Sequence, residues 1–374
     1  MAGSPNLSSS SDGSHQERAG AVLLTGGRLH EPYSKVAHGL IRDSERFEIV
    51  AVVDDISAGR DAGEVLDGGA REIPVVASFG DVATLVAAGS TKPTWAIIGV
   101  ATHGGKLSPA LIESAAEALR NDMSVAAGVH EYLSDVPELV ELAKARGLEL
   151  LDLRKPKPPS ELHFWTGAID AVEAPRLAVL GTDCAVGKRT TTRLLHHALR
   201  AADTRSELIA TGQTGWLQGA SYGFVLDSVP NDFVSGELEH AIVTCWEAER
   251  PDLILLEGQS ALRNPSGPCG AELLLSGDAR ATVLQHAPGR TWFDGCESID
   301  KRIPPVDDEI ALIRHYGSEV LGVCLSGEKL TPDQLIEERD ALRATLDIPV
   351  VAPMIDGVES LVQPIQAYIE SATS

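Results

Sequence analysis

The stretch RLAVLGTDCAVGKRT, residues 176–190, decides the fold class of this chain. Its apolar start, 176–181, predicts a buried strand, and the pattern around and after Lys188 predicts a helix over 187–202. A strand, a glycine-bearing turn and a helix that opens at a lysine form a phosphate loop, in which backbone N–H groups and the helix dipole attract an anion. We therefore expect phosphate to be bound by Gly181, Thr182, Asp183, Gly187, Lys188, Arg189, Thr190 and Thr191.

The residue after the lysine distinguishes this loop from the common pattern. A Ser or Thr hydroxyl normally stands there and holds Mg²⁺ against the β- and γ-phosphates, but this chain has Arg189. A guanidinium cannot ligate a cation, yet it grips a phosphate through paired N–H bonds. We expect the loop to anchor a diphosphate without a metal site. In the alternative interpretation, Arg189 points away and Thr190 takes the metal-binding role after a local shift.

The chain beyond the loop continues to alternate between strands and helices. Apolar runs predict further strands at 207–211, 252–256, 281–285, 319–324 and 348–352. Helices are expected at 232–249, 307–316, 332–345 and 356–371. Asp232 is a candidate N-cap for the first of them. Because such alternation forms a parallel sheet covered on both faces, residues 171–374 are predicted to be a P-loop NTPase-like, doubly wound α/β domain.

Polar segments follow three of these strands: TGQTGWLQG (211–219), LEGQSALRNP (256–265) and QHAPGRTWFDG (285–295). The carboxyl ends of parallel strands meet at one edge of a sheet, so we expect these segments to line one pocket. Their candidate functional residues are Gln213, Thr214, Glu257, Gln259, Ser260, His286, Arg290 and Asp294. For each single residue, a structural role as a cap or turn former is an equal alternative.

An N-terminal Rossmann-like α/β domain is expected over 20–153. Its apolar runs are AVLLTG, EIVAVVDD, IPVVAS, TWAIIGVA, SVAAGV and LELLDL, with amphipathic stretches between several of them, such as 107–121 and 135–147. The turn after the first run, TGGRLHEPYSK, lacks the G-x-G-x-x-G of dinucleotide sites. Bound NAD is therefore not expected, although Asp54 and Asp55 stand where a ribose-binding carboxylate lies. His103 and Lys106, in GVATHGGK, are expected at the carboxyl edge of this sheet.

Two segments without regular structure are expected. RKPKPPSEL (154–162) marks the boundary between the domains, because its prolines continue neither a helix nor a central strand. We expect a proline-rich linker over 154–170. Residues 1–19 are rich in Ser and Gly with little to bury, and they are expected to form a disordered tail.

The composition excludes several classes of partner. The net charge is -23, from 54 acidic and 31 basic residues, which repels nucleic acid and anionic membranes. No apolar run is long enough to span a bilayer and the N-terminus lacks a signal-peptide pattern, so a cytoplasmic protein is expected. The low share of lysine among the basic residues suits a halophilic host or a GC-rich genome. Scattered cysteines predict neither a disulfide framework nor a structural zinc site.

The loop GTDCAVGKRT resembles that of the dethiobiotin synthetase branch of phosphate-loop proteins, with a departure at Arg189. Together with TGQTGW, NDFVSGELE, LEGQSAL and QHAPGR in this order, the chain from residue 20 onward resembles more closely a two-domain phosphate-loop family formerly of unknown function. Some members of that family are D-glutamate N-acetyltransferases. The resemblance implies transfer of the acetyl group of acetyl-CoA to the amine of D-glutamate, a step in D-amino acid catabolism. The loop would then hold the CoA diphosphate without cleaving it.

The implied reaction needs a base that takes a proton from the attacking amine. Glu257, His286 and Asp183 are the candidates within reach of the expected pocket. Cys184 lies inside the loop and is the candidate for an acyl-cysteine intermediate. Direct attack by the amine is expected instead, because no histidine accompanies Cys184 in the sequence.

The same reaction needs ligands for an oxyanion and for the substrate carboxylates. The oxyanion suits backbone N–H groups of 212–215 or 258–260 and the side-chain amides of Gln213 and Gln259. The carboxylates require cations, for which the candidates are Arg290, Arg154 and Lys155. Thr214 and Ser260 complete the candidate substrate ligands.

Two other functions are alternatives. An ATP- and Mg²⁺-dependent ligase or kinase resembling dethiobiotin synthetase would use Glu257 and Thr190 with the metal, and Lys188 on the transferred phosphoryl group. A non-catalytic nucleotide or acyl-CoA sensor would bind its ligand without turnover. In each case the partners are small molecules, and a symmetric homo-oligomer is expected for a large soluble enzyme of this class.

Overall fold

The computed structural model describes residues 18–101 and 105–373. The expected N-terminal tail lies mostly outside these residues, and the first strand already begins at Ala19. The candidate His103 lies outside the described residues as well. All structural statements below concern the described part of the chain.

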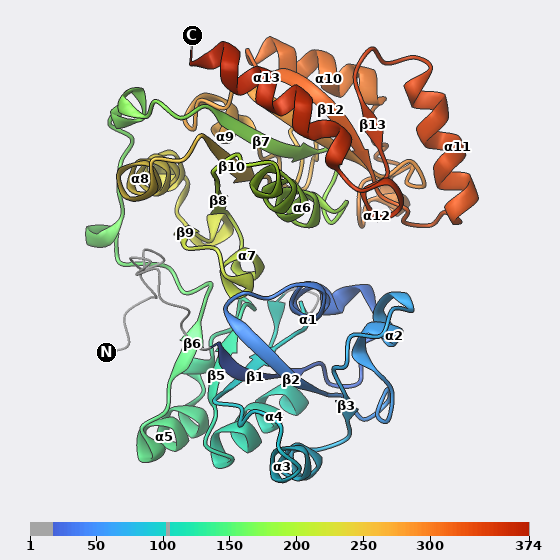
Figure 1. Ribbon diagram of the computed structural model, residues 1–374. Coiled ribbons are helices and arrows are strands. Elements are labelled where there is room, and N and C mark those ends of the chain that lie inside the picture. The colour runs from blue at the N-terminus through green and yellow to red at the C-terminus, as the bar shows by residue number, and fades with distance from the viewer. Residues whose placement is uncertain (1–17, 102–104, 374) are drawn as a thin grey trace. The chain divides into compact units, whose positions relative to one another are not determined.

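The described chain divides into two compact units, each of them a sheet with helices on both faces (Figure 1). Of the described residues, the first unit comprises 18–101, 105–158 and 213–220, and the second comprises 159–212 and 221–373. This division falls inside the expected linker 154–170. The predicted fold class, two parallel-sheet α/β domains, is confirmed.

The sheet of the first unit has the strand order β3-β2-β1-β4-β5-β6, with every neighbouring pair parallel. Its strands are β1 (Ala19–Leu24), β2 (Phe47–Val53), β3 (Val75–Val76), β4 (Trp95–Ile98), β5 (Ser124–Ala127) and β6 (Leu150–Asp152). This order is that of dinucleotide-binding Rossmann folds, in which the chain changes direction between β1 and β4. The carboxyl ends of β4, β5 and β6 therefore lie side by side.

Two hydrophobic cores cover the two faces of this sheet. One contains buried residues of α3 (Phe79–Ala87), α4 (Pro109–Arg120) and α5 (Pro137–Arg146). The other contains buried residues of α1 (Lys35–Arg42) and α2 (Ala62–Asp67), and it also includes Leu217. Alternating side chains of a strand point to opposite faces, which is why Val22 and Leu24 lie in the first core and Leu23 in the second.

Helix α7 (Gln213–Gln218) packs in the first unit, although the chain on both sides of it belongs to the second. The Arg46 guanidinium stacks over the Trp216 ring, 4.1 Å from its centroid, and Arg46 Nε donates to the Trp216 carbonyl at 2.8 Å. Gln218 Nε2 donates to the Gly39 carbonyl at 2.9 Å, which ties α7 to α1. These polar contacts and the buried Leu217 explain why α7 joins the core of the first unit.

The second unit contains the sheet β13-β12-β11-β7-β10-β8-β9, again parallel throughout. Its strands are β7 (Arg176–Gly181), β8 (Ser206–Ala210), β9 (Tyr222–Gly223), β10 (Leu253–Glu257), β11 (Ala281–His286), β12 (Glu319–Leu325) and β13 (Val350–Val351). Strand β7 is central and fully buried, with β10 on one side and β11 on the other. The segments after β10 and β11 therefore lie next to the loop that follows β7. Of the segment after β8, only Thr211 and Gly212 belong to this unit, so the expected pocket shared by all three segments stays a prediction.

The helices of the second unit agree closely with the sequence pattern at most positions. They are α6 (Lys188–Ala201), α8 (Asn231–Glu249), α9 (Ala271–Leu275), α10 (Val306–His315), α11 (Pro332–Arg343), α12 (Pro353–Asp356) and α13 (Val362–Ala372). Asp232 is not the N-cap of α8, because Pro230 takes that position and Asp232 lies in the first turn. The single helix predicted over 356–371 is wrong at its start, since Gly357 with φ 73° ends α12 before α13 begins.

The NDFVSGELE segment fastens the chain that enters the second unit onto α8. A Cβ atom at Gly236 would lie 2.0 Å from the His163 carbonyl oxygen, so only glycine allows this close approach. Glu237 Oε1 accepts from the His163 backbone N–H at 3.0 Å and lies 2.7 Å from His163 Nδ1. Glu239 accepts from the backbone N–H and the hydroxyl of Thr166. This motif therefore has a structural role.

Short 3-10 turns connect several of these elements: Pro32–Ser34, Leu133–Asp135, Pro159–Glu161, Ala168–Ala171, Leu226–Ser228, Glu297–Ile299 and Glu359–Leu361. Among the helices of the described residues, we find none whose length and hydropathy would suit passage through a bilayer. The expectation that membranes are poor partners rests on the charge of the chain.

Candidate functional site

The phosphate loop of the second unit has the backbone that its sequence predicts. Strand β7 ends at Gly181, which pairs with Gln285 of β11, and α6 begins at Lys188 with Gly187 as its N-cap. Ala185 and Gly187 have positive φ values, 54° and 107°. Left-handed residues in such a turn direct successive N–H groups toward one point, which creates a site for an anion at the start of the helix.

Lys188 is buried beneath this loop. Its Nζ donates to the backbone oxygens of Asp183 and Ser260, both at 2.6 Å. Burial lowers the pKa of Lys188 to about 8, while neighbouring acidic groups favour its charged form. A Cβ atom at Gly181 would lie 3.0 Å from Lys188 Cδ, so glycine at the end of β7 leaves room for the lysine stem. The ammonium is thus fixed between the loop and the segment after β10.

Asp183 and Arg290 form a buried ion pair in the same loop. Arg290 Nη1 lies 2.8 Å from Asp183 Oδ2, which also accepts from the Asp294 backbone N–H at 2.8 Å. Asp183 Oδ1 accepts from Asn264 Nδ2 at 2.9 Å, and Arg290 also bonds to Glu328. These contacts argue against the expected roles of Asp183 as base and of Arg290 as ligand of a substrate carboxylate, because each already serves the loop.

Glu257 ends β10, the strand next to the phosphate loop, and its side chain is 4% exposed. Its Oε2 atom is buried and has no hydrogen-bond partner among the described residues. Burial raises the pKa of Glu257 to about 7, against the opposing charges of Arg189 and Lys188. A carboxyl group that changes its charge near neutral pH beside a phosphate loop is suited to accept a proton.

The backbone after Glu257 turns sharply over β7. A Cβ atom at Gly258 would lie 2.2 Å from the Val179 carbonyl oxygen, so this position requires glycine. Ser260 has φ 39°, a left-handed conformation that strains a non-glycine residue and that recurs at functional sites. Its carbonyl oxygen accepts a hydrogen bond from Lys188 Nζ, and its Oγ accepts one from the Cys184 thiol at 3.3 Å. Ser260, a predicted substrate ligand, is therefore hydrogen-bonded to the phosphate loop.

Gln259 connects the segments after β8 and β10. Its Nε2 donates to Thr211 Oγ1 at 3.0 Å, and the Thr211 hydroxyl donates to the Glu257 carbonyl at 2.6 Å. A Cβ atom at Gly212 would lie 3.0 Å from Gln259 Nε2, so a larger residue there would crowd the amide. Thr211, which sequence reasoning did not single out, is thus the residue that orients Gln259 beside Glu257.

His286 ends β11 on the other side of β7. Its Nδ1 lies 2.9 Å from Thr182 Oγ1, so these two predicted residues are hydrogen-bonded to each other. Burial lowers the pKa of His286 to about 4, which keeps the imidazole neutral at physiological pH. A neutral imidazole with so low a pKa is a weaker base than Glu257, and His286 is better suited to orient the Thr182 hydroxyl.

Two of the three threonines after Arg189 make side-chain hydrogen bonds within the second unit. Thr191 Oγ1 donates to Gln285 Oε1 at 2.6 Å, and Thr192 Oγ1 donates to the Lys188 carbonyl at 2.8 Å. Thr190 is half-buried at the start of α6. Because the helix begins at Lys188 itself, Arg189 holds the position that a metal-binding hydroxyl has in the common pattern.

Other predicted residues come together in the first unit. Arg154 Nη1 lies 2.9 Å from His130 Nε2, and Arg154 Nη2 donates to Gln213 Oε1 at 3.2 Å. Because a guanidinium can only donate, His130 accepts at Nε2 and carries its proton on Nδ1. A Cβ atom at Gly128 would lie 2.5 Å from Gln213 Cγ, so glycine makes room for this cluster. Sequence reasoning missed His130, whose position just after β5 was the available signal.

Lys155, Thr214 and Asp54 have other surroundings in the first unit. Lys155 Nζ donates to Ser134 Oγ at 2.6 Å, and Thr214 is the second residue of α7. Asp54 accepts from Thr25 Oγ1 at 2.6 Å and from the Leu29 N–H at 2.9 Å. Its carboxylate therefore shapes the turn after β1, a role that differs from binding a ribose.

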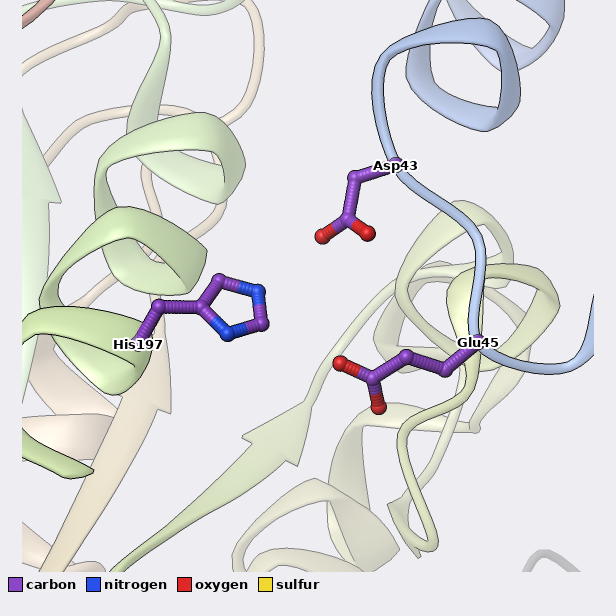
Figure 2. Close-up of side chains that lie close together, drawn as sticks. All are labelled: Asp43, Glu45 and His197. Carbon is purple, nitrogen blue, oxygen red and sulfur yellow. The ribbon is translucent and has the colours of Figure 1, made fainter. Parts of the chain in front are cut away.

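Figure 2 shows Asp43 and Glu45, which follow α1 in the first unit, and His197, which lies on α6 of the second. Imidazole and carboxylate groups are ligands for many divalent metals. Because these three side chains belong to different units, we assign no metal site to them.

Comparison with known proteins identifies both units. The family described as "Domain of unknown function (DUF1611_C) P-loop domain" matches residues 163–362, and "Domain of unknown function (DUF1611_N) Rossmann-like domain" matches residues 56–156. The chain belongs to the DUF1611 family. The predicted Rossmann-like and P-loop domains are thereby confirmed, as is the resemblance to a two-domain family formerly of unknown function.

Two curated relatives of this DUF1611 chain are named D-glutamate N-acetyltransferase. The protein from Pseudoalteromonas sp is 31% identical over 273 residues, which are 71% of this chain and 79% of the relative. The protein from Tritonibacter scottomollicae is 29% identical over 280 residues, 72% of this chain and 80% of the relative. A crystal structure of a DUF1611 family protein from Anabaena variabilis ATCC 29413 has a TM-score of 0.83 at 27% identity, covering 94% of this chain and 100% of that one. The names of the two relatives indicate that this chain is an enzyme.

Proposed function

We propose that this protein transfers the acetyl group of acetyl-CoA to the amine of D-glutamate. The observation that carries the proposal is Glu257, a buried carboxyl group with a pKa of about 7 beside a phosphate loop whose lysine and arginine form a cationic anchor. The names of two relatives, each about 30% identical to this chain, support the choice of reaction and acceptor.

The phosphate loop is the proposed anchor of the CoA diphosphate. Lys188 and Arg189 supply positive charge, and the N-terminal N–H groups of α6 supply donors. The diphosphate lies far from the thioester and does not react. Its binding energy therefore serves to position the acetyl group for attack.

In the proposed step, the amine nitrogen of D-glutamate attacks the thioester carbonyl carbon while Glu257 accepts the proton that the nitrogen loses. A C–N bond forms, and the carbonyl electrons move onto the oxygen of a tetrahedral intermediate. When the C–S bond breaks, CoA leaves as a thiolate that takes the proton from Glu257. The products are N-acetyl-D-glutamate and CoA, and no oxidant or metal is required.

The oxyanion of this intermediate needs donors that are already in place. Gln259 is the proposed side-chain donor, because Thr211 fixes its amide through one N–H and leaves the second N–H for the ligand. Ser260 has a structural part in this proposal, since its carbonyl holds Lys188.

Thiol release tests the proposal. Purified protein is incubated with acetyl-CoA and either D- or L-glutamate, and free CoA is followed with a thiol reagent. We expect release with D-glutamate and much less with L-glutamate. Absence of release with both enantiomers would refute the proposed reaction.

The position of Glu257 favours one second candidate, an ATP-dependent ligase or kinase. A carboxylate at the end of the strand beside a phosphate loop is also where such enzymes hold Mg²⁺. This alternative predicts ADP release from ATP that requires Mg²⁺ and stops when the metal is chelated. Acetyl transfer by the proposed route would be indifferent to the chelator.

A further inference from the structure

Phosphate loops that use a metal combine two oxygen ligands near the reacting phosphates. One is the hydroxyl of the residue after the lysine, and the other is a carboxylate on a neighbouring strand. In this chain the second part is present as Glu257 at the end of β10, whereas the first is replaced by Arg189. The site therefore has the carboxylate of a magnesium site, Glu257, but has the Arg189 guanidinium in place of the hydroxyl ligand.

The start of α6 shows that Arg189, and no neighbouring residue, holds the position of the usual hydroxyl. Gly187 is the N-cap and Lys188 the first helical residue, so Arg189 stands where the hydroxyl would stand. Thr190 is turned about 100° further around the helix axis. The hydroxyls of Thr191 and Thr192 are already hydrogen-bonded within the second unit.

The carboxyl group of Glu257 is influenced by several positively charged side chains. The side chains of Arg189, Lys188 and Arg193 each favour the ionised form of its carboxyl group, so all three cations act on this one buried acid. Its Oε2 atom has no hydrogen-bond partner in the described part of the chain, which leaves an acceptor available inside the site. The positive charges of these side chains would repel a divalent cation placed beside Glu257.

We propose that Arg189 takes the place of the divalent cation, so that the loop binds the diphosphate of an ester such as CoA without metal. In this arrangement the Arg189 guanidinium supplies positive charge to the diphosphate and favours the ionised form of Glu257. The inference deepens the proposed function and rests on it for the identity of the ester. The residues at this site do not fit Mg²⁺, and no step of the proposed reaction passes through a metal.

Binding of CoA, measured by isothermal titration calorimetry, tests this proposal without relying on turnover. The wild-type protein is expected to bind CoA with the same Kd in EDTA and in excess Mg²⁺. The Arg189→Thr variant restores the common pattern, and in EDTA its Kd should rise about tenfold to a hundredfold through loss of a charged hydrogen-bond donor. Added Mg²⁺ should recover most of that loss in the variant alone.

A second substitution shows whether Glu257 supplies the other half of the restored metal site. In Arg189→Thr combined with Glu257→Gln, Mg²⁺ should no longer improve CoA binding. Arg200→Thr is the matched control, because Arg200 lies on the same helix with a side chain that is 56% exposed. Circular dichroism melts establish that each variant is folded.

Several outcomes would overturn the inference. They are loss of wild-type CoA binding in EDTA, unchanged binding by Arg189→Thr in EDTA, and Mg²⁺ rescue that persists without Glu257. Failure of acetyl transfer with CoA binding intact would instead refute the proposed function alone. The two claims are therefore tested separately.

Discussion

Arg290 and Asp183 form a buried ion pair, 2.8 Å between Arg290 Nη1 and Asp183 Oδ2, that joins the phosphate loop to the segment after β11. The Arg290 and Asp183 side chains are 7% and 0% exposed, and Arg290 also donates to the Cys184 carbonyl at 2.7 Å. The segments after β7 and β11 are thus joined by charge as well as by strand pairing. The sequence makes Asp183 a candidate base and Arg290 a candidate ligand of a substrate carboxylate, whereas their contacts in the structure join two loops.

Removing the Asp183 carboxylate should therefore affect stability. Asp183→Ala removes one of the two counter-charges of the buried Arg290, the other being Glu328. Breaking a buried pair costs about 3 kcal/mol. The urea unfolding midpoint of the second unit should fall accordingly. Glu113→Ala is the control, because the pair between Glu113 and Arg120 is exposed and should leave the midpoint unchanged. Equal stability of Asp183→Ala and the wild type would show that the pair is dispensable.

Lys188→Ala should act mainly on the affinity for acetyl-CoA. Because the ammonium is expected to bind the diphosphate equally in the ground state and the transition state, its loss raises KM, by about tenfold or more, with a much smaller change in kcat. Initial rates over a range of acetyl-CoA concentrations provide the measurement. Lys144→Ala, at an exposed position of α5, is the matched lysine control. An unchanged KM in Lys188→Ala would remove the loop from the cosubstrate site.

The rate should follow the ionisation of Glu257. The base is active only as the carboxylate, so kcat/KM should rise with pH and level off above a pKa of about 7. Glu257→Gln should lower the rate by about a hundredfold or more and abolish this limb of the pH profile. A profile that keeps the same limb in Glu257→Gln would assign the base to another residue.

The same ionisation should appear in stability. The pKa of Glu257 is higher in the folded chain than its ordinary value of 4.5. Between these values the folded state binds more protons than the unfolded state, so the free energy of unfolding falls as the pH rises from about 4.5 through about 7. The urea midpoint of Glu257→Gln should not show this decrease with rising pH. Midpoints of the two proteins at pH 5 and pH 8 provide the comparison.

Gly236→Ala should loosen the segment 163–169 from α8. Alanine normally stabilises a helix interior by about 1 kcal/mol relative to glycine, but here its Cβ would lie 2.0 Å from the His163 carbonyl oxygen. Overpacking costs about 1–3 kcal/mol, so the clash is expected to win. Chymotrypsin should cleave the variant faster at Phe164 or Trp165. Gly80→Ala in α3, whose Cβ would meet nothing closer than 3.5 Å, should instead be neutral or stabilising.

The local pattern of the sequence was enough to predict the phosphate loop and most of the second sheet. Gly187 and Lys188 define the helix start by spacing alone, and β7 is a short apolar run with both faces buried. The helix boundary at Gly357 was missed because the residues on both sides of it suit a helix. Only the backbone shows the positive φ that separates α12 from α13.

Pairing between distant residues could not be predicted from the sequence. Arg290 is separated from Asp183 by 107 positions, and nothing local to either residue indicates the other. The same holds for α7, whose packing in the first unit depends on Arg46 and the core around α1. His130 follows β5 without any motif, so its contact with Arg154 emerges only when the sheet brings the ends of β5 and β6 together.

Product analysis in the absence of metal tests the central claim most directly. Purified protein in EDTA is incubated with D-glutamate and acetyl-CoA labelled in the acetyl group, and the products are identified by mass spectrometry. The account predicts labelled N-acetyl-D-glutamate in equal amount to the CoA thiol released. Unlabelled glutamate with no free thiol in EDTA would contradict it. In a parallel incubation with ATP, Mg²⁺-dependent formation of ADP would then favour the ligase or kinase.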